Sequence, residues 1–221
     1  AVGYNAGSAI TTGIRNVLIG NEAGLALTTG GSNVAVGHEA LKNEDGNGRN
    51  TAIGSGTLFT QNAGAQAYNV AVGYQAGGSI TTGVKNVLVG SFALDAANTG
   101  QENTAIGHQA LTADTKGQRN VAVGHGALSA QNFTSATNSE NTAMGYNAGA
   151  TTTTADYNTL IGSFAGTSIT TGSNNVMLGR FAGGGFDTEG NNLGIGRNAL
   201  SGSINGGEYN VAIGNYTLDA L

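Results

Sequence analysis

A unit of about 17 residues recurs along the whole chain, and this period restricts the possible folds more than any other feature. The unit carries the motif Asn–(Val/Thr)–(Ala/Leu)–(Ile/Val)–Gly–x–x–Ala–(Gly/Leu), and one clear copy runs from Asn69 to Gly77. A fixed period of this kind predicts a solenoid in which each copy forms one coil. The motif glycines that mark the thirteen copies are Gly3, Gly20, Gly37, Gly54, Gly73, Gly90, Gly107, Gly124, Gly145, Gly162, Gly179, Gly196 and Gly214.

A longer period of four coils lies on top of the short one. Every fourth coil is lengthened, at residues 58–69, 128–141 and 200–210. The sequence therefore predicts a single repeat domain over residues 1–221, built from blocks at approximately 1–68, 69–140 and 141–209 with a partial coil at 210–221. Because the chain starts inside a motif copy, we expect it to be a fragment of a longer protein.

Each motif copy predicts a short β-strand followed by a turn. Its second and fourth residues are β-branched or long apolar residues that share one strand face, and its third residue points to the other face. Glycine then permits the turn, and a second extended stretch such as residues 79–82 completes a coil of two strands and two turns. The glycine density and the absence of 3.6-residue spacing exclude helices. The expected fold is all-β, a parallel β-solenoid of thirteen coils stacked about 4.8 Å apart.

The motif strand is apolar on both faces, whereas a thin coil has only one interior. Strands that are apolar on both faces are usually buried on both. We therefore expect the third-position alanines to face away from the core of their own coil and to be covered by copies of the same chain. Three-fold packing would place Ala35, Ala52, Ala71 and Ala105 along the axis of a homotrimer.

The asparagine that opens each full motif copy predicts a ladder along the stack. Stacked amides can donate to the carbonyl of the next amide, as in other asparagine ladders. A row of ligand-binding amides is the alternative, and the structural role is the prediction. The ladder residues are Asn16, Asn33, Asn50, Asn69, Asn86, Asn103, Asn120, Asn141, Asn158, Asn175, Asn192 and Asn210.

Composition excludes several classes of function. Eight Lys and Arg residues are spread singly through a chain of net charge −5, so no basic patch for nucleic acid is expected. No apolar run is long enough to insert into a membrane. The chain has no cysteine, and its thirteen acids form no column, so we expect no catalytic residue, no cofactor and no metal site. His38, His108 and His125 follow motif glycines and are interpreted as exposed turn residues rather than metal ligands.

Aromatic residues and the lengthened coils are the candidates for contact with an outside partner. Loops that project from a rigid scaffold often carry recognition residues. We expect the long segments Gln61–Tyr68, Ser129–Glu140 and Ser201–Tyr209 to bulge from the solenoid. Aromatic side chains on a surface can stack on sugars or anchor a protein, or can pack where copies of the chain meet. The candidate contact residues are Tyr68, Phe133, Tyr209, Tyr4, Tyr74 and Tyr146.

The motif copies resemble the repeats of phage tail-fibre proteins. The resemblance rests on the stretch Asn103 to Gly107, on the stretch Asn69 to Gly77 and on the return Thr81-Thr82-Gly83 that leads to Asn86. The strand motif is also similar to the head repeats of trimeric autotransporter adhesins, whose heads are trimers of left-handed β-rolls with shorter repeats. The resemblance implies a left-handed, trimeric solenoid at an extracellular or virion surface.

These observations favour a structural and adhesive fibre segment that provides length and stiffness and presents an exterior able to bind a cell-surface glycan or protein. The head of a bacterial trimeric adhesin is the first alternative. A polysaccharide-processing solenoid enzyme is the second, and it would need clustered acids on one coil face, which the sequence lacks.

Overall fold

The computed structural model describes residues 1–46, 48–202 and 206–219 and shows a parallel β-solenoid without helices in these ranges, as the repeat predicts. The chain divides into two compact units, Ala1–Gln109 and Ala110–Leu221. The division falls inside the second four-coil block, and each unit is described by itself.

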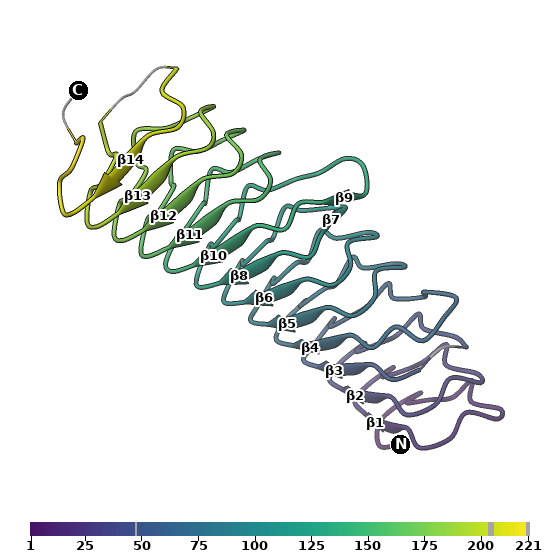
Figure 1. The fold of residues 1–221 in the computed structure, drawn as a ribbon. Helices are drawn as coiled ribbons and strands as arrows, with labels where there is room; N and C mark the ends of the chain where they lie inside the picture. The colour runs from purple at the N-terminus through teal and green to yellow at the C-terminus, as the bar shows by residue number, and fades with distance from the viewer. Residues whose placement is uncertain (47, 203–205, 220–221) are drawn as a thin grey trace. The chain divides into compact units, whose positions relative to one another are not determined.

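In the first unit, six short strands lie side by side as rungs, one for each full motif copy (Figure 1). Each strand pairs in parallel with the next, and equivalent motif residues pair with each other, as Leu18 does with Ala35. Val2 of the truncated first copy forms an isolated bridge to Ile19. The strands are β1 (Val17–Ile19), β2 (Val34–Val36), β3 (Thr51–Ile53), β4 (Val70–Val72), β5 (Val87–Val89) and β6 (Thr104–Ile106).

The second unit repeats this arrangement and adds a pair of two-residue strands. Strand β7 (Gly117–Gln118) pairs in parallel with β9 (Thr137–Asn138), which lies in the longest coil, one coil further along the chain. The motif strands again keep equivalent residues in register, as with Ala143 and Leu160. They are β8 (Val121–Val123), β10 (Thr142–Met144), β11 (Thr159–Ile161), β12 (Val176–Leu178), β13 (Leu193–Ile195) and β14 (Val211–Ile213).

The orientation of the motif strand is the reverse of the predicted one. The third motif residue is buried in all twelve strands, and Ala35, Ala52, Ala71 and Ala105 are fully buried in the interior of their own coils. The second and fourth residues point outward and are half-buried or exposed. The prediction that the alanines face away from the coil core is therefore wrong. A coil this thin has room inside for one row of motif-strand side chains beside the asparagine column, so the two rows of β-branched residues lie outside.

The second extended stretch of each coil is also not a regular strand in most copies. Among the described residues, only β7 and β9 form strands on the return side of the coil. Elsewhere, single backbone hydrogen bonds join successive coils, as when the Thr81 N–H donates to the Asn98 carbonyl at 3.0 Å. The return segments are stacked turns rather than a second sheet.

The motif glycine is required by both backbone conformation and space. At Gly73, φ is +138°, and an added Cβ would lie 2.6 Å from the carbonyl atoms of Gly90 in the next coil. Side chains rarely adopt this φ, and the close approach of two backbones leaves no room for one. The glycine column therefore lets the coils stack at strand spacing.

The interior balances large residues against small ones. Where the third motif residue is Leu88, the coil before it has Gly77, and an added Cβ on this glycine would lie 2.7 Å from the Leu88 side chain. Leu160 occupies the same space beside Gly149 and Gly166. In coils with alanine at the third position, a leucine such as Leu111 or Leu128 fills the interior from the other side. The four-coil period in the sequence thus reflects complementary packing, since close-packed interiors tolerate little empty volume.

Candidate functional site

The asparagine column forms a buried hydrogen-bonded ladder whose geometry differs from the expected amide-to-amide chain. Within each unit, the Oδ1 of each ladder asparagine except the last accepts a hydrogen bond from the backbone N–H of the next one, as Asn86 Oδ1 does from Asn103 N at 3.0 Å. In seven of the ladder asparagines the Nδ2 group donates to a backbone carbonyl in the following turn, as Asn86 does to Gly100 at 3.0 Å, whereas Asn50 Nδ2 has no partner among the described residues. Direct side-chain contacts also occur, for example from Asn86 Nδ2 to Asn69 Oδ1 at 3.2 Å.

The ladder residues therefore serve the fold rather than a ligand. Asn69, Asn86, Asn141 and Asn175 are completely buried, and their amides are used by backbone groups of adjacent coils. A buried backbone group without a partner is costly, and each of these four asparagines satisfies two such groups that a turn leaves unpaired.

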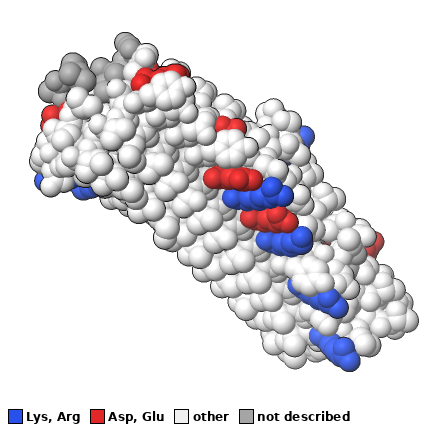
Figure 2. Space-filling model, in the orientation of Figure 1, with Lys and Arg blue, Asp and Glu red and all other residues white. Residues whose placement is uncertain are grey.

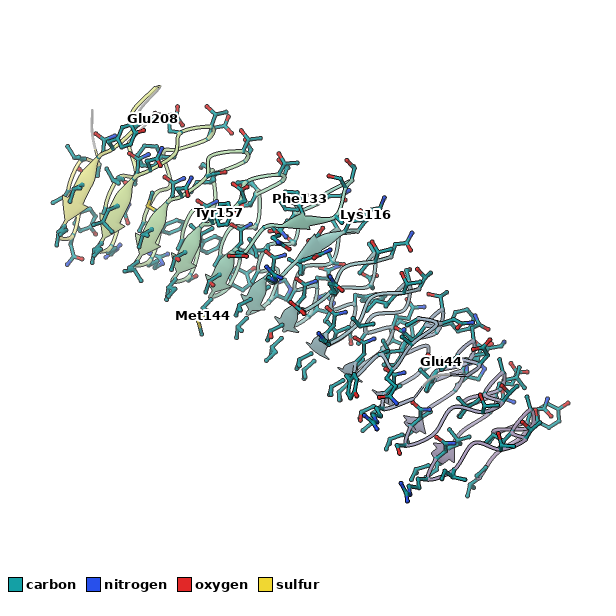
Figure 3. The ribbon with its side chains drawn as sticks, turned by 45° about the vertical axis from the view of Figure 1, so that its right-hand side comes forward. Glu44, Lys116, Phe133, Met144, Tyr157 and Glu208 are labelled. Atoms are coloured by element: carbon teal, nitrogen blue, oxygen red, sulfur yellow. The ribbon has the colours of Figure 1, made fainter. Side chains whose placement is uncertain are left out.

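The outward face of the motif strands is an uncharged sheet surface. Its second and fourth motif positions, twenty-four side chains in twelve strands, contain only Val, Ile, Leu, Met and Thr. Val17 is 48% exposed and Met144 is 42% exposed, and Met144 projects away from the sheet (Figure 3). We call these twenty-four positions the outer strand face. Within each unit it presents a regular series of apolar side chains at the coil spacing.

Within each unit, charged residues lie in a column beside this face. The residue immediately before each ladder asparagine has a left-handed backbone, as Lys85 and Glu102 do with φ near 60°. Lys85 Nζ lies 3.2 Å from Glu102 Oε1, and Arg119 Nη1 lies 3.3 Å from Glu140 Oε1. Figure 2 shows Lys or Arg next to Asp or Glu in a narrow stripe, with uncharged surface beside it. We call this series the edge column.

Aromatic rings follow the motif glycines on the other side of the outer strand face. In the first unit, the Tyr74 and Phe92 rings meet edge to face with centroids 5.3 Å apart. In the second unit, the His125 ring stacks on Tyr146 at 5.2 Å, and Tyr146 meets Phe164 edge to face at 5.2 Å. Rings at the first position after the motif glycine, such as Tyr74, and rings at the second position, such as Phe92, therefore form one ladder of rings in each unit.

Most of the predicted contact aromatics are exposed. Tyr4, Tyr68, Tyr74, Tyr146 and Tyr209 are 45–76% exposed. Tyr68 and Tyr209 belong to the edge column, where Tyr157 is also exposed (Figure 3), although the sequence analysis did not single it out.

Phe133 is the exception, because it is only 7% exposed and cannot serve as a surface contact. Its N–H donates to the Asp114 carboxylate at 3.2 Å, and its carbonyl accepts from the Thr115 hydroxyl at 2.8 Å. These bonds hold the Phe133 backbone against the preceding coil. Its place in a lengthened segment predicted exposure, but the bonds to Asp114 and Thr115 hold this part of the segment against the solenoid and Phe133 lies inward.

The three long segments are anchored to different extents. In Gln61–Tyr68, Gln61 and Ala67 are buried, and residues 64–66 are exposed. In Ser129–Glu140, Gln131 and Ser139 are buried and β9 pairs with β7, so this segment is partly built into the solenoid. In Ser201–Tyr209, residues 203–205 lie outside the described residues.

A buried acid and amide pair runs under the longest coil, and the sequence analysis missed it. Gln131 Nε2 donates to Asp114 Oδ2 at 2.7 Å, while Gln131 Oε1 accepts from Asn141 Nδ2 at 2.9 Å. Gly117 N–H donates to Asp114 Oδ1 at 2.9 Å. Burial raises the pKa of Asp114 above its usual 3.8, although these hydrogen bonds oppose the shift. Glu44 and Gln61 occupy the corresponding buried positions four coils earlier, and this recurrence of an acid before a glutamine was the available signal.

A hollow of about 460 Å³ opens on the turn side of the first unit around Ser55 and Gly56. Tyr74, Phe59, Glu39 and Asp95 contribute to its walls. The hollow was not expected from the sequence, where Ser55-Gly56 reads as an ordinary turn. The signal was the pair of small residues between two coils that carry His38-Glu39 and Tyr74-Gln75 at the same positions.

The predicted turn histidines form no metal centre with their neighbours. Over residues 1–46, 48–202 and 206–219, no three His, Asp or Glu side chains are placed to hold a metal ion. His108 and His125 instead belong to the aromatic ladders. The same ranges contain no helix with the length and apolar character needed to cross a bilayer.

Comparison with known proteins adds no relative. The chain matches no family model, no curated protein and no solved structure. Its function is therefore argued from its own surfaces.

Proposed function

We propose that this chain is a segment of an extracellular fibre that assembles as a homotrimer through the outer strand face. The observation that carries the proposal is the sheet face of each unit, twenty-four side chains in all without a single charge, which remains accessible on the single chain. Soluble proteins rarely expose large contiguous apolar surfaces unless another molecule covers them. The resemblance of the repeats to phage tail-fibre proteins supports the trimeric state, left-handed coiling and a place on a virion surface.

A second copy of the chain is the partner that best suits this surface. Apolar side chains recur once per coil, so a partner with the same axial spacing can interlock with each row in turn. A copy of the chain has this spacing by construction, and every added coil extends the contact. The buried alanine column cannot take this role, since Ala71 and its equivalents already pack inside their own coils.

The borders of the outer strand face resemble the rim of an interface. Lys85 and Glu102 lie at one border, two residues before strands β5 and β6. Tyr74 and Phe92 lie at the other border, two or three residues after strands β4 and β5. Protein interfaces commonly combine an apolar centre with a polar rim and with enriched aromatic residues. Charges confined to a border also fix the register between copies better than an apolar face alone.

The experiment is a mass measurement by light scattering during size-exclusion chromatography. We expect three times the chain mass of 21.8 kDa for the natural sequence. Replacing both Val87→Glu and Val89→Glu should produce single chains, because two carboxylates would be buried without partners at the contact. Thr82→Glu lies on the exposed return side of the same coil and should leave the trimer intact. A natural chain that runs as a folded monomer at micromolar concentration would refute the proposal.

A further inference from the structure

The hollow beside Tyr74 exists because one coil lacks side chains that its neighbours have. The coil before it carries His38 and Glu39 after the motif glycine, and the coil after it carries Tyr74 and Gln75. Between them, Ser55 and Gly56 leave a gap two coil spacings wide, about 9.6 Å from row to row. One flat ring midway in this gap lies about 4.8 Å from each row. This spacing is close to the 5.2 Å between the centroids of the stacked His125 and Tyr146 rings in the second unit.

The second unit shows what fills the equivalent space when the protein supplies a ring of its own. Tyr146 corresponds to Tyr74, and each meets the phenylalanine of the following coil edge to face. At the position of Ser55, the second unit has His125, whose ring stacks on Tyr146 with an interplanar angle of 22°. The structure thus contains one occupied and one open version of the same ring slot.

The walls of the open slot combine aromatic and hydrogen-bonding groups. Tyr74 is half exposed and offers a ring, and Phe59 adds a second apolar wall. Glu39 and Asp95 supply carboxylates, while Ser55 supplies a hydroxyl. Lys42 Nζ lies 2.7 Å from Glu39 Oε1 and also 2.7 Å from Glu22, so this border carries both signs of charge.

This lining matches the chemistry of a sugar ring. The C–H face of a pyranose packs on an aromatic ring, and its hydroxyls donate to carboxylates and accept from hydroxyl groups. An anionic ligand would meet the Glu39 and Asp95 carboxylates, which disfavour it. The volume of about 460 Å³ also falls in the range of small-molecule sites.

We propose that the slot between the His38-Glu39 and Tyr74-Gln75 rows binds one neutral pyranose ring of a glycan, stacked on Tyr74 in the place that His125 takes on Tyr146. The slot is made by residues of one chain. Because Tyr74 also borders the outer strand face, light scattering on each variant separates a loss of binding from a loss of assembly.

Saturation-transfer NMR on the full chain tests the proposal, with methyl α-D-glucopyranoside and methyl β-D-galactopyranoside as neutral probes and N-acetylneuraminic acid as the anionic probe. We expect transfer to at least one neutral glycoside, with a Kd on the order of 1 mM, as for a small ligand with few hydrogen bonds. No transfer to either neutral glycoside at tens of millimolar overturns the proposal. Transfer to the anionic probe alone overturns it as well.

Three variants locate the binding. Ser55→His should abolish transfer by filling the slot as His125 does in the second unit. Tyr74→Ala should raise the Kd about tenfold or more through loss of the stacking wall. Tyr146→Ala is the matched control and should leave the Kd unchanged. Circular dichroism checks that each variant folds, and if Ser55→His does not fold, Tyr74→Ala alone decides. An unchanged Kd in a folded Ser55→His or Tyr74→Ala variant overturns the site.

Discussion

Replacing Asn86 by alanine tests the asparagine ladder at a position where both of its backbone contacts are known. Asn86 is fully buried in the first unit. Its Oδ1 accepts from Asn103 N at 3.0 Å, and its Nδ2 donates to the Gly100 carbonyl at 3.0 Å. The Asn86→Ala variant removes both bonds and keeps the backbone bond from Asn86 N to Asn69 Oδ1.

The expected loss follows from the two groups left behind. A buried donor or acceptor that loses its partner costs about 1–3 kcal/mol, because it cannot recover the hydrogen bond that water gives it in the unfolded chain. Two such groups predict a loss of about 2–6 kcal/mol in the free energy of unfolding per chain. This is a large fraction of the 5–15 kcal/mol that typically stabilises a domain.

Urea denaturation followed by circular dichroism measures this loss. Asn21→Ala is the matched control, because Asn21 is exposed and lies just after a motif glycine, outside the ladder. We expect the control to change the free energy of unfolding by less than about 0.5 kcal/mol. If Asn86→Ala costs no more than the control, water reaches the ladder and its amides do not stabilise the fold.

Two further predictions concern the backbone and the buried acid. Gly73→Ala should lower the free energy of unfolding by about 3 kcal/mol or more, because φ is +138° and the new Cβ would lie 2.6 Å from Gly90. Gly64→Ala is the control and should cost about 1 kcal/mol, because φ is +66° and the space around it is open. Equal losses of stability in thermal melts would contradict the close-approach argument. Burial raises the pKa of Asp114 above 3.8, so the folded chain holds this proton more tightly than the unfolded chain does. The stability that protonation adds is therefore fully present below pH 3.8 and is lost as the pH rises through the folded-state pKa. As the pH rises through that range, the unfolding free energy of the natural chain minus that of Asp114→Asn should fall in denaturant titrations. If this difference rises with pH instead, Asp114 is not the buried group with a raised pKa.

The repeat was sufficient to predict the coils, because their signal is local and periodic. A glycine at each turn, β-branched residues beside it and an asparagine before it recur at one spacing, and equivalent residues can pair in register only if each copy forms one layer. The strands β1 to β6, for example, fall on the predicted motif copies. The four-coil period could be predicted for the same reason, because the longer spacings between motif glycines can be counted directly in the sequence.

The inward or outward direction of each strand was decided by the tertiary structure. Alternation in a sequence shows that neighbouring residues lie on opposite faces, and it does not show which face is inside. Val87 and Leu88 are both apolar, so hydrophobicity gave no preference between them. The width of the coil interior determined which face lies inside. A coil closed by tight turns has space for one row of side chains, such as Ala71 or Leu88, and not for two rows of β-branched side chains.

The candidate sites divide in the same way. The asparagine column and the exposed tyrosines could be identified from the sequence, because their positions within the repeat are fixed. The open ring slot at Ser55 and the inward turn of Phe133 could not be predicted, since each depends on residues one or two coils away. The sequence by itself determined the repeating layer. The stacking of layers decided which side chains meet, because contacts between coils join residues that are distant in the chain, such as Thr57 and Gly73, which are 16 positions apart.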